Sequence, residues 1–435
     1  MPEPQSRIRD LLDAHFPGAW GEDPSSTRGA NVSILRSTNL DDDGHVDLST
    51  GAARRFSARE LAEKRLAGGD ILLEASGGGP GKPVGRVALF RQEGEHAFAS
   101  SNFFRTLRVN RRLADPAYVT WSLQRLQKRP EIWQFQQQTT GIINLRYADY
   151  LNSKIFTPSL AEQRRIAEIL DSFDLAIFHL RSPSTKFTQL RTAHIRKLMD
   201  DGLSILRSVE ASELSCVERK MHGRWTVAPL ASTLDAIEAG NSPNVEDSPA
   251  GPGEWGVLKV SAIGRHGFRP EENKVAHDKS LHVKNLCVHP GDLLISRANT
   301  SELVGLTCVV RETPPGLMLC DKTLRLHVNP TRTSAEYVHL ALSLTEIRRQ
   351  IETAATGTSG SMKNISQAAI RRLMIPWADR ELIDRVVRDD AAYVAQIEAL
   401  MRQEQGLIRL KQGLMEDLLT GRVRVSEAEA VVESL

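Results

Sequence analysis

Two long stretches of the chain carry apolar residues at helical spacing. In the first, the apolar positions alternate between intervals of four and three residues: Ile166, Leu170, Phe173, Ile177 and Leu180. In the second, six leucines and isoleucines form a similar stripe: Ile397, Leu400, Leu407, Leu410, Leu414 and Leu418. This spacing is typical of a coiled-coil seam. We therefore predict two long helices, at residues 158–205 and 377–424, that pair with each other in antiparallel orientation.

A proline and two polar residues interrupt the apolar pattern of these helices. Pro183 lies inside the first predicted helix, where a proline costs about 3 kcal/mol because it removes one backbone hydrogen bond. We therefore expect the first helix to be interrupted near Pro183, by a kink or by a short helix–loop–helix. His194 and Glu404 also lie on the otherwise apolar stripes.

The segments outside the helices alternate short apolar strands with polar loops, and the same order occurs twice. GDILLEAS at Gly69 returns as GDLLISRA at Gly291, TLRVN at Thr106 returns as TLRLHVN at Thr323, and ILRSTNL at Ile34 corresponds to VLKVSAI at position 257. Each pair is separated by between 217 and 223 residues (323 − 106 and 257 − 34). Because this period is far longer than that of a solenoid repeat, we infer a duplicated domain.

The predicted fold class is therefore α+β. Two mixed α/β domains, at residues 1–157 and 206–376, are expected in a pseudo-twofold arrangement and are joined by the two long antiparallel coiled-coil helices. The acidic tail, residues 425–435, is expected to be mobile or weakly helical.

A glycine-rich loop, SGGGPGK, follows the first copy of the repeated strand. It resembles the phosphate loop G-x-x-x-x-G-K-[ST] only at Gly81 and Lys82, because Ser76 and Pro83 occupy the two terminal positions of the motif. The second copy reads SRANTSELVG and lacks both the glycine run and the lysine. A nucleotide-binding phosphate loop therefore cannot be the shared function. A common scaffold with different loops favours two recognition surfaces that read different targets.

Composition narrows the function classes. The 435 residues include 56 basic and 54 acidic side chains, a net charge of +2, which allows nucleic-acid binding if the basic groups cluster on one face. The sequence contains no apolar run of the ~18 residues that a membrane span requires. The cysteines lack a C-x-x-C pair and histidines at zinc-ligand spacing, so we expect no metal and reduced thiols in a cytoplasmic protein: Cys216, Cys287, Cys308 and Cys320.

The chain also lacks the motifs of the enzymes that act on DNA. The [DN]-P-P-[YF] motif of amino-methyltransferases is missing, since Asn329 and Pro330 are followed by Thr331 and Arg332. No paired-carboxylate nuclease pattern is recognisable either. These absences favour a binding protein over an enzyme.

The order of domain, long helix, domain and long helix resembles the DNA-specificity subunit of type I restriction–modification systems. Five motifs carry the resemblance: GDLLIS at Gly291, GTSGSMKNIS ending at Ser366, the MIP turn ending at Pro376, LKQGLMEDLLTGRVRV from Leu410, and IFTPSLAEQRRIAEIL from Ile155. They are spread over nearly the whole chain.

The resemblance implies a non-catalytic reader of double-stranded DNA. Each target-recognition domain would read one part of a bipartite sequence, and the paired helices would set the spacing and dock two methyltransferase subunits. The chain itself would hold no cofactor. S-adenosylmethionine would serve the methyltransferase partner, and ATP and Mg²⁺ the restriction/translocase partner.

Candidate DNA contacts are arginine, lysine, amide and hydroxyl side chains in the predicted loops, since these groups bind base edges and phosphates. In the first domain they are Arg36, Ser37, Thr38, Asn39, Ser76, Lys82, Arg105, Thr139, Thr140, Asn144 and Arg146. In the second they are Lys259, Ser261, Ser296, Arg297, Asn299, Thr300, Lys322, Thr358, Ser359, Ser361, Lys363 and Asn364.

Three alternatives are compatible with the same residues. A duplicated coiled-coil scaffold could pair other chains without reading DNA, and an enzyme of unrecognised motif could act on DNA by itself. A specificity subunit of a related DNA-modifying defence system would have the same sequence features.

Overall fold

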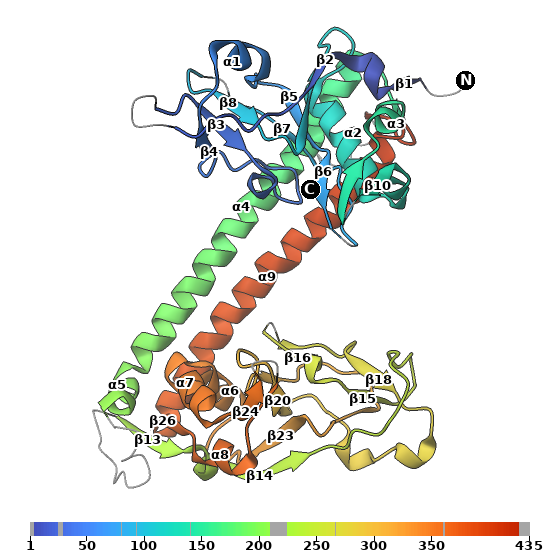
Figure 1. Cartoon of the computed structure of the whole chain (residues 1–435). Coiled ribbons are helices and arrows are strands. Elements are labelled where there is room, and N and C mark those ends of the chain that lie inside the picture. Colours follow the sequence, from blue (N-terminus) through green and yellow to red (C-terminus); the bar gives the residue numbers. More distant parts are fainter. Residues whose placement is uncertain are drawn as a thin grey trace. The chain divides into compact units, whose positions relative to one another are not determined.

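The computed structural model describes residues 4–24, 29–79, 81–92, 94–139, 141–208, 224–265, 267–359 and 362–425. The chain divides into two compact units (Figure 1). Unit 1 consists of residues 1–183 and 400–435, and unit 2 of residues 184–399. The predicted acidic tail lies almost entirely outside the described residues.

The described residues of unit 1 form four small sheets. In sheet order, their strands are β2 (Leu12–Pro17), β9 (Phe104–Val109), β5 (Asp70–Glu74) and β7 (Val87–Leu89); β4 (Ala52–Arg54), β3 (Val32–Leu35) and β8 (Phe98–Ser100); β10 (Gln136–Thr139), β11 (Ile142–Leu145) and β6 (Ser76–Gly78); and β1 (Gln5–Arg7) with β12 (Lys154–Phe156). Its shorter helices are α1 (Ala58–Lys64), α2 (Pro116–Lys128) and α3 (Tyr147–Leu151).

In the part of unit 2 that the structure describes, there are four matching sheets and one extra strand pair. The strands, in the corresponding order, are β14 (Leu234–Ala239), β23 (Thr323–Val328), β19 (Leu293–Ser296) and β21 (Thr307–Val309); β18 (Asn273–Val275), β15 (Gly256–Leu258) and β22 (Leu317–Met318); β24 (Thr356–Ser359), β25 (Met362–Asn364) and β20 (Ala298–Asn299); β13 (Trp225–Pro229) with β26 (Met374–Ala378); and β16 (Ile263–Gly264) with β17 (Gly267–Phe268). Its shorter helices are α5 (Asp200–Ser208), α6 (Ala335–Ser343), α7 (Thr345–Ala354) and α8 (Gln367–Arg372).

The topology confirms the duplication down to individual strand directions. The second sheet of each unit contains one parallel pair, β3 with β8 and β15 with β22. A buried tyrosine makes the same tether in both units: the Tyr118 hydroxyl donates to the Phe156 carbonyl at 2.7 Å, and the Tyr337 hydroxyl to the Pro376 carbonyl at 2.6 Å. The predicted fold of two mixed α/β domains joined by two long helices is confirmed.

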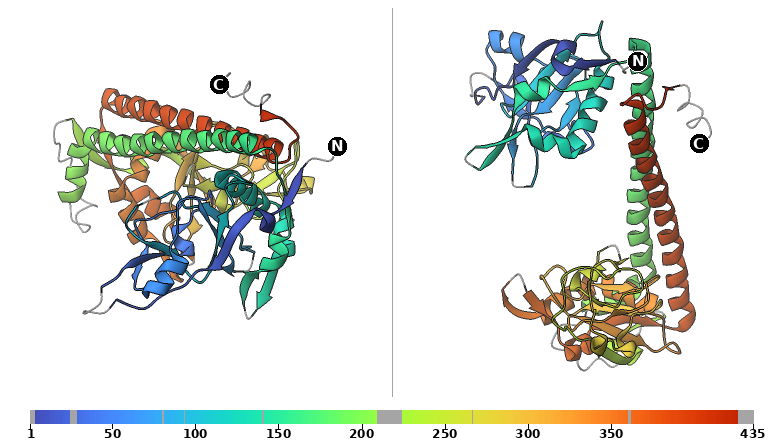
Figure 2. Two further views of the ribbon diagram at one scale, coloured as in Figure 1. Left: turned by 90° about the horizontal axis from the view of Figure 1, so that it is seen from above. Right: turned by 90° about the vertical axis from the view of Figure 1, so that its right-hand side faces the viewer.

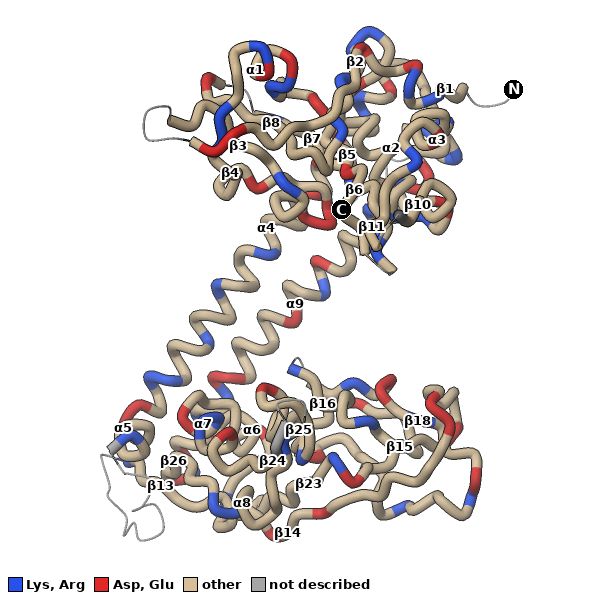
Figure 3. The backbone as a smooth tube through the Cα atoms, viewed as in Figure 1, with Lys and Arg blue, Asp and Glu red and all other residues tan. Residues whose placement is uncertain are grey.

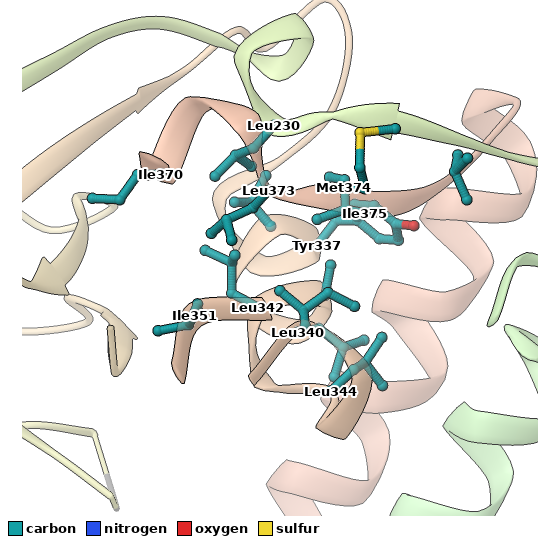
Figure 4. Close-up of a cluster of buried hydrophobic side chains, with 14 of the residues drawn as sticks. Leu230, Tyr337, Leu340, Leu342, Leu344, Ile351, Ile370, Leu373, Met374 and Ile375 are labelled. Carbon is teal, nitrogen blue, oxygen red and sulfur yellow. The ribbon is translucent and has the colours of Figure 1, made fainter. Parts of the chain in front are cut away.

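Each unit has its own hydrophobic core. In unit 2, helices α6, α7 and α8 pack with strand β26 around a cluster that includes Tyr337, Leu340, Ile351 and Ile375 (Figure 4). In unit 1, the fully buried strand β5 contributes Ile71 to the main core. These cores fix the ends of β5 and β19, from which the recognition loops depart.

Helices α4 (Leu160–Leu198) and α9 (Arg380–Leu418) run side by side and antiparallel (Figures 1 and 2). In unit 1, Arg181 Nε donates to Glu404 Oε1 at 2.7 Å. In unit 2, Arg191 Nε donates to Asp390 Oδ1 at 2.7 Å, and His194 Nε2 lies 2.9 Å from Asp389 Oδ2. The two polar interruptions of the apolar stripes, His194 and Glu404, therefore each have a polar partner on the other helix.

The predicted interruption by a helix–loop–helix at Pro183 is wrong, because α4 contains this residue in its interior. The ring crowds the preceding turn and removes the hydrogen bond to the carbonyl group four residues earlier, but Pro183 is only half-buried, so that carbonyl can be hydrated. Arg181 and Arg191 anchor the helix to α9 on either side of the proline. This pairing offsets the local cost.

Replacing Pro183 with alanine should stabilise the chain, because α4 gains a hydrogen bond and loses a steric clash. The free energy of unfolding should rise by up to ~3 kcal/mol, measured by thermal or urea denaturation. Ser184→Ala, one residue further along the same helix, is the matched control and should raise it by no more than ~0.5 kcal/mol. A lower stability for Pro183→Ala would contradict the assignment of a continuous α4.

Leu414→Asp should destabilise unit 1, because Leu414 is buried in a cluster with Ile166, Leu170 and Leu418. Placing a carboxylate there should cost ~3 kcal/mol or more. Leu190→Asp is the control, since the Leu190 side chain is exposed on α4 and its replacement should change stability by less than ~0.5 kcal/mol. Equal denaturation midpoints for both variants would contradict the buried seam.

Candidate nucleic-acid interface

In unit 1, the predicted contact residues near the glycine loop converge on the small sheet β10–β11–β6. Strand β6 continues directly from the buried strand β5, and it is held in place by Ala75. The Ala75 amide donates to the Phe103 carbonyl at 2.8 Å, and the Ala75 carbonyl accepts from the Leu145 amide at 2.8 Å. The hydrophobic core therefore positions this sheet through its first strand.

The outward face of this sheet is polar. On β11, Ile143 and Leu145 are buried in the core, so strand alternation turns Ile142 and Asn144 to the other side. Ser76 stands opposite Asn144, and its hydroxyl donates to Asn144 Oδ1 at 2.5 Å. Gln137 of β10 also stands opposite Asn144, and it is exposed. Amide and hydroxyl groups thus share one face, as direct reading of base edges requires.

Unit 2 builds the same sheet from β24, β25 and β20. The Arg297 amide donates to the Lys322 carbonyl at 2.8 Å, and the Arg297 carbonyl accepts from the Ile365 amide at 3.0 Å. Arg297 therefore occupies the position of Ala75, and Lys322 the position of Phe103. In the neighbouring register, Ala298 stands opposite Asn364, as Ser76 stands opposite Asn144.

The two units thus differ in side chains on an equivalent backbone. Unit 2 has the exposed cations Arg297 and Lys322 where unit 1 has Ala75 and the aromatic ring of Phe103. Both units keep an asparagine, Asn144 or Asn364, at one position. The duplicated scaffold presents two chemically different surfaces.

Cationic groups also flank the sheet in unit 1. Lys82 and Arg146 are exposed, and the Arg105 guanidinium lies 5.1 Å from the centre of the Tyr147 ring. Burial raises the pKa of Tyr147 to about 12, although Arg105 acts in the opposite direction, so the phenol is neutral at physiological pH. Figure 3 shows that basic and acidic residues are mixed over both units, so the positive charge near the sheets is local.

Other predicted residues are engaged within the protein. Asn39 is only 2% exposed, and its amide donates to the Asp47 carbonyl and to Thr50 Oγ1. Arg36 Nη2 donates to the Thr50 carbonyl at 2.9 Å, and Arg36 lies beside Ser37 and the exposed Thr38. These contacts brace the loop that follows β3.

The matching loop of unit 2 is braced in a similar way. Lys259 Nζ lies 2.7 Å from Asp247 Oδ1, and the Ser261 hydroxyl donates to Glu272 Oε2 at 2.5 Å. Ser296 is fully buried. Three further residues make contacts near the small sheet: Asn299 Oδ1 accepts from the Thr300 amide at 2.9 Å, and Lys363 Nζ donates to the Gly357 carbonyl at 2.8 Å.

Some of the predicted DNA-contact residues are described only in part or not at all. Thr140 and Ser361 lie outside the described residues. Thr139 belongs to β10, and Thr358 and Ser359 to β24, as backbone.

The sequence reasoning missed four exposed residues near the sheets: Phe103, Gln137, Ile142 and Met362. The alternation in IINL, residues 142–145, could have found Ile142, because two buried apolar residues at 143 and 145 turn 142 and 144 outward. Phe103 could have been found by aligning it with Lys322 in the repeat.

Seven of the predicted seam residues belong to, or pack against, one apolar cluster that α4 and α9 form in unit 1: Ile166, Leu170, Phe173, Leu407, Leu410, Leu414 and Leu418. All eleven predicted seam residues are buried or half-buried: Ile166, Leu170, Phe173, Ile177, Leu180, Ile397, Leu400, Leu407, Leu410, Leu414 and Leu418. Tyr118 and Trp121 of α2 join the same cluster. Lys411 lies 4.2 Å from the Trp121 ring and pairs with Asp174. Burial lowers the pKa of Lys411, although Asp174 acts in the opposite direction.

Among the described residues, no group of histidine, cysteine and carboxylate side chains could hold a metal ion. The three described cysteines are free and buried, and burial raises the pKa of the Cys308 thiol to about 12, which makes it a poor nucleophile. Cys216 lies outside the described residues. None of the described helices combines the length and apolar character needed to span a membrane.

Comparison with known proteins matches the arrangement described above. Residues 52–182 match the family model of the type I restriction modification DNA specificity domain. The EcoEI type I restriction enzyme specificity subunit of Escherichia coli is 34% identical over 149 residues, which cover 34% of this chain and 25% of that protein. The chain is thus aligned with only a quarter of that relative.

Two other relatives are aligned over nearly the whole chain. A protein of Methanocaldococcus jannaschii, provisionally named the MjaX type I restriction enzyme specificity subunit, is 24% identical and covers 96% of this chain and 93% of its own length. The crystal structure of a type I restriction–modification S subunit from M. genitalium has a TM-score of 0.58, with 14% identity and 96% coverage of both chains. At this identity, the structural likeness shows the fold alone.

The fold thus places the chain in a class of proteins in which one α/β domain occurs twice, joined by a pair of long helices. Within that class, the chain resembles the DNA-specificity subunits of type I restriction–modification enzymes, which confirms the resemblance inferred from the sequence motifs.

Proposed function

We propose that this chain is the non-catalytic DNA-reading subunit of a type I restriction–modification complex and that it recognises a bipartite target. Unit 1 reads one part of the target through the sheet β10–β11–β6. Unit 2 reads the other part through the sheet β24–β25–β20.

One observation carries this proposal. The two sheets have the same backbone connections, including the amide and carbonyl bonds of Ala75 and Arg297, but they present different side chains. A protein that needed one binding activity twice would gain nothing from this difference. Two different sequences require two different sets of groups on the same scaffold.

In this proposal, the paired helices α4 and α9 form the binding site for the partner subunits. Two methyltransferase subunits bind α4 and α9, and restriction/translocase subunits join through them. S-adenosylmethionine is then bound by the methyltransferase, and ATP with Mg²⁺ by the restriction subunits. This chain contributes the choice of sequence.

The direct test is co-expression with a cognate methyltransferase subunit, followed by single-molecule sequencing of methylated adenines in the host DNA. The expected result is one motif in two short parts with a fixed gap, present only when this chain is expressed. A stable complex without any methylation would instead favour the scaffold alternative. Methylation without restriction of unmodified DNA would indicate a related modifying system.

Arg297→Ala should relax or weaken the reading of one half-site and leave the other intact. A base contact of this kind contributes ~1–3 kcal/mol, so the methylation rate at the wild-type motif should fall by about five- to 150-fold at subsaturating DNA. The measurement is the methylated motif of the variant. Arg269→Ala is the matched control, because its side chain is bonded to the Ser261 carbonyl and not to the sheet. An unchanged motif and rate for Arg297→Ala would dismiss Arg297 as a reader.

A further inference from the structure

Both units expose a large apolar side chain at the same position of the small sheet. Ile142 is the first residue of β11 and Met362 the first residue of β25, and each side chain is 46% exposed. In register, Ile142 stands opposite Thr139, and Met362 opposite Ser359. Both members of each pair differ by 220 residues between the units (362 − 142 and 359 − 139), so the positions are equivalent.

The fold does not explain why these positions are apolar. The nearest buried residue that follows is Ile143 within β11 in unit 1, and Ile365 directly after the end of β25 in unit 2. Ile142 and Met362 are members of none of the hydrophobic clusters formed by the described residues. A polar residue would be as compatible with the strand, and a single exposed apolar residue would be unremarkable. The same exposure at both copies of a duplicated position requires a reason.

Their surroundings indicate the kind of surface that they meet. Strand alternation places Ile142 on the same face as Asn144, which carries the hydrogen bond to Ser76. Met362 shares its face with the exposed Asn364 in the same way. Each apolar side chain therefore lies two residues from an asparagine, beside the turn of a hairpin (residues 136–145 or 356–364).

The backbone next to Ile142 is open to a ligand. Gly141 has a φ of +86°, and a Cβ added there would meet no atom within 4 Å. Among the described residues, no atom therefore obstructs the approach of a ligand to Gly141. A β-ribbon of this size can enter a groove of DNA.

We propose that Ile142 and Met362 are wedges that enter the DNA at the two half-sites and insert between neighbouring base pairs. The inference rests on the proposed function and adds a second mode of reading to it. Isoleucine and methionine are among the residues that proteins use to unstack and kink a base step. Asn144 and Asn364 hydrogen-bond to base edges, and the affinity also depends on how easily the adjacent base step unstacks to admit Ile142 or Met362.

A consequence is that part of the specificity comes from deformability. Pyrimidine–purine steps unstack more easily than other steps. Each half-site should therefore contain such a step next to its most strongly selected adenine, at the position that the wedge reaches.

The test uses the complex of the full chain with its methyltransferase and duplexes of the target found by methylation sequencing. Adenines other than the one that is methylated are replaced one at a time by 2-aminopurine, whose fluorescence rises when it is unstacked. The methylated adenine is left in place, because a methyltransferase extrudes its target base by itself. The wild-type complex should produce one rise in each half-site. Ile142→Ser should abolish the rise in one half-site, Met362→Ser should abolish the rise in the other, and each should weaken binding about tenfold, equivalent to ~1.4 kcal/mol.

Matched variants separate insertion from loss of apolar surface. Ile142→Leu and Met362→Leu should keep the fluorescence rise. Leu113→Ser in unit 1 and Val283→Ser in unit 2 remove exposed apolar side chains elsewhere and should change neither fluorescence nor affinity.

The possible failures are distinguishable. If the wild-type complex does not prefer its target duplex to a scrambled one, the proposed function fails. If the wild-type complex binds its target but no 2-aminopurine brightens, or if the rises persist in the serine variants, the wedge inference is overturned. It is also overturned if Ile142→Ser releases the methyltransferase on size-exclusion chromatography, because the residue would then contact a protein.

Discussion

The burial of α4 against α9 is the interaction on which the rest of the structure depends. Residues far apart in the sequence, Leu170 and Leu418 among them, share one cluster in unit 1. In unit 2, Ile195 of α4 and Ile383 of α9 belong to the main core. Each α/β unit is therefore completed by both helices. The apolar contacts supply most of the stabilisation, because exposed ion pairs such as Arg181–Glu404 each contribute little.

In this structure, the backbone determines where the small sheets lie, and the outward side chains determine what the sheets can bind. Buried strands β5 and β19 fix where the small sheets begin, and the hydrogen bonds at Ala75 and Arg297 fix how they are registered. The outward side chains are then free to differ, as Phe103 and Lys322 do. In our account, a new DNA sequence can be read by changing these side chains without changing the core.

Much of the fold could be predicted from the sequence because its signals are local or repeated. The four-and-three spacing of Ile166, Leu170 and Phe173 predicted α4, and the recurrence of GDILLEAS as GDLLISRA predicted the duplicated unit. The continuous helix at Pro183 could not be predicted, because it depends on contacts with α9 that are distant in sequence. Tertiary pairing outweighed a local cost of about 3 kcal/mol.

The candidate site was predicted less completely than the fold. Loop residues were selected by residue type, and this choice cannot distinguish an outward asparagine such as Asn364 from Asn39, which is buried and bonded within its own loop. Strand register decides which side chains share a face, and register depends on pairing between distant segments such as β6 and β11.

The central claim is that each small sheet contacts one part of a bipartite target. The most direct measurement is photo-crosslinking, with benzoylphenylalanine placed at the exposed positions of Gln137 in unit 1 and Asn364 in unit 2. The account predicts that the first crosslinks only to one half-site of the target duplex and the second only to the other, while the same group at Leu113 does not crosslink to DNA. Crosslinks from both sheets to the same half-site, or none from either sheet in a complex that binds its target, would contradict it.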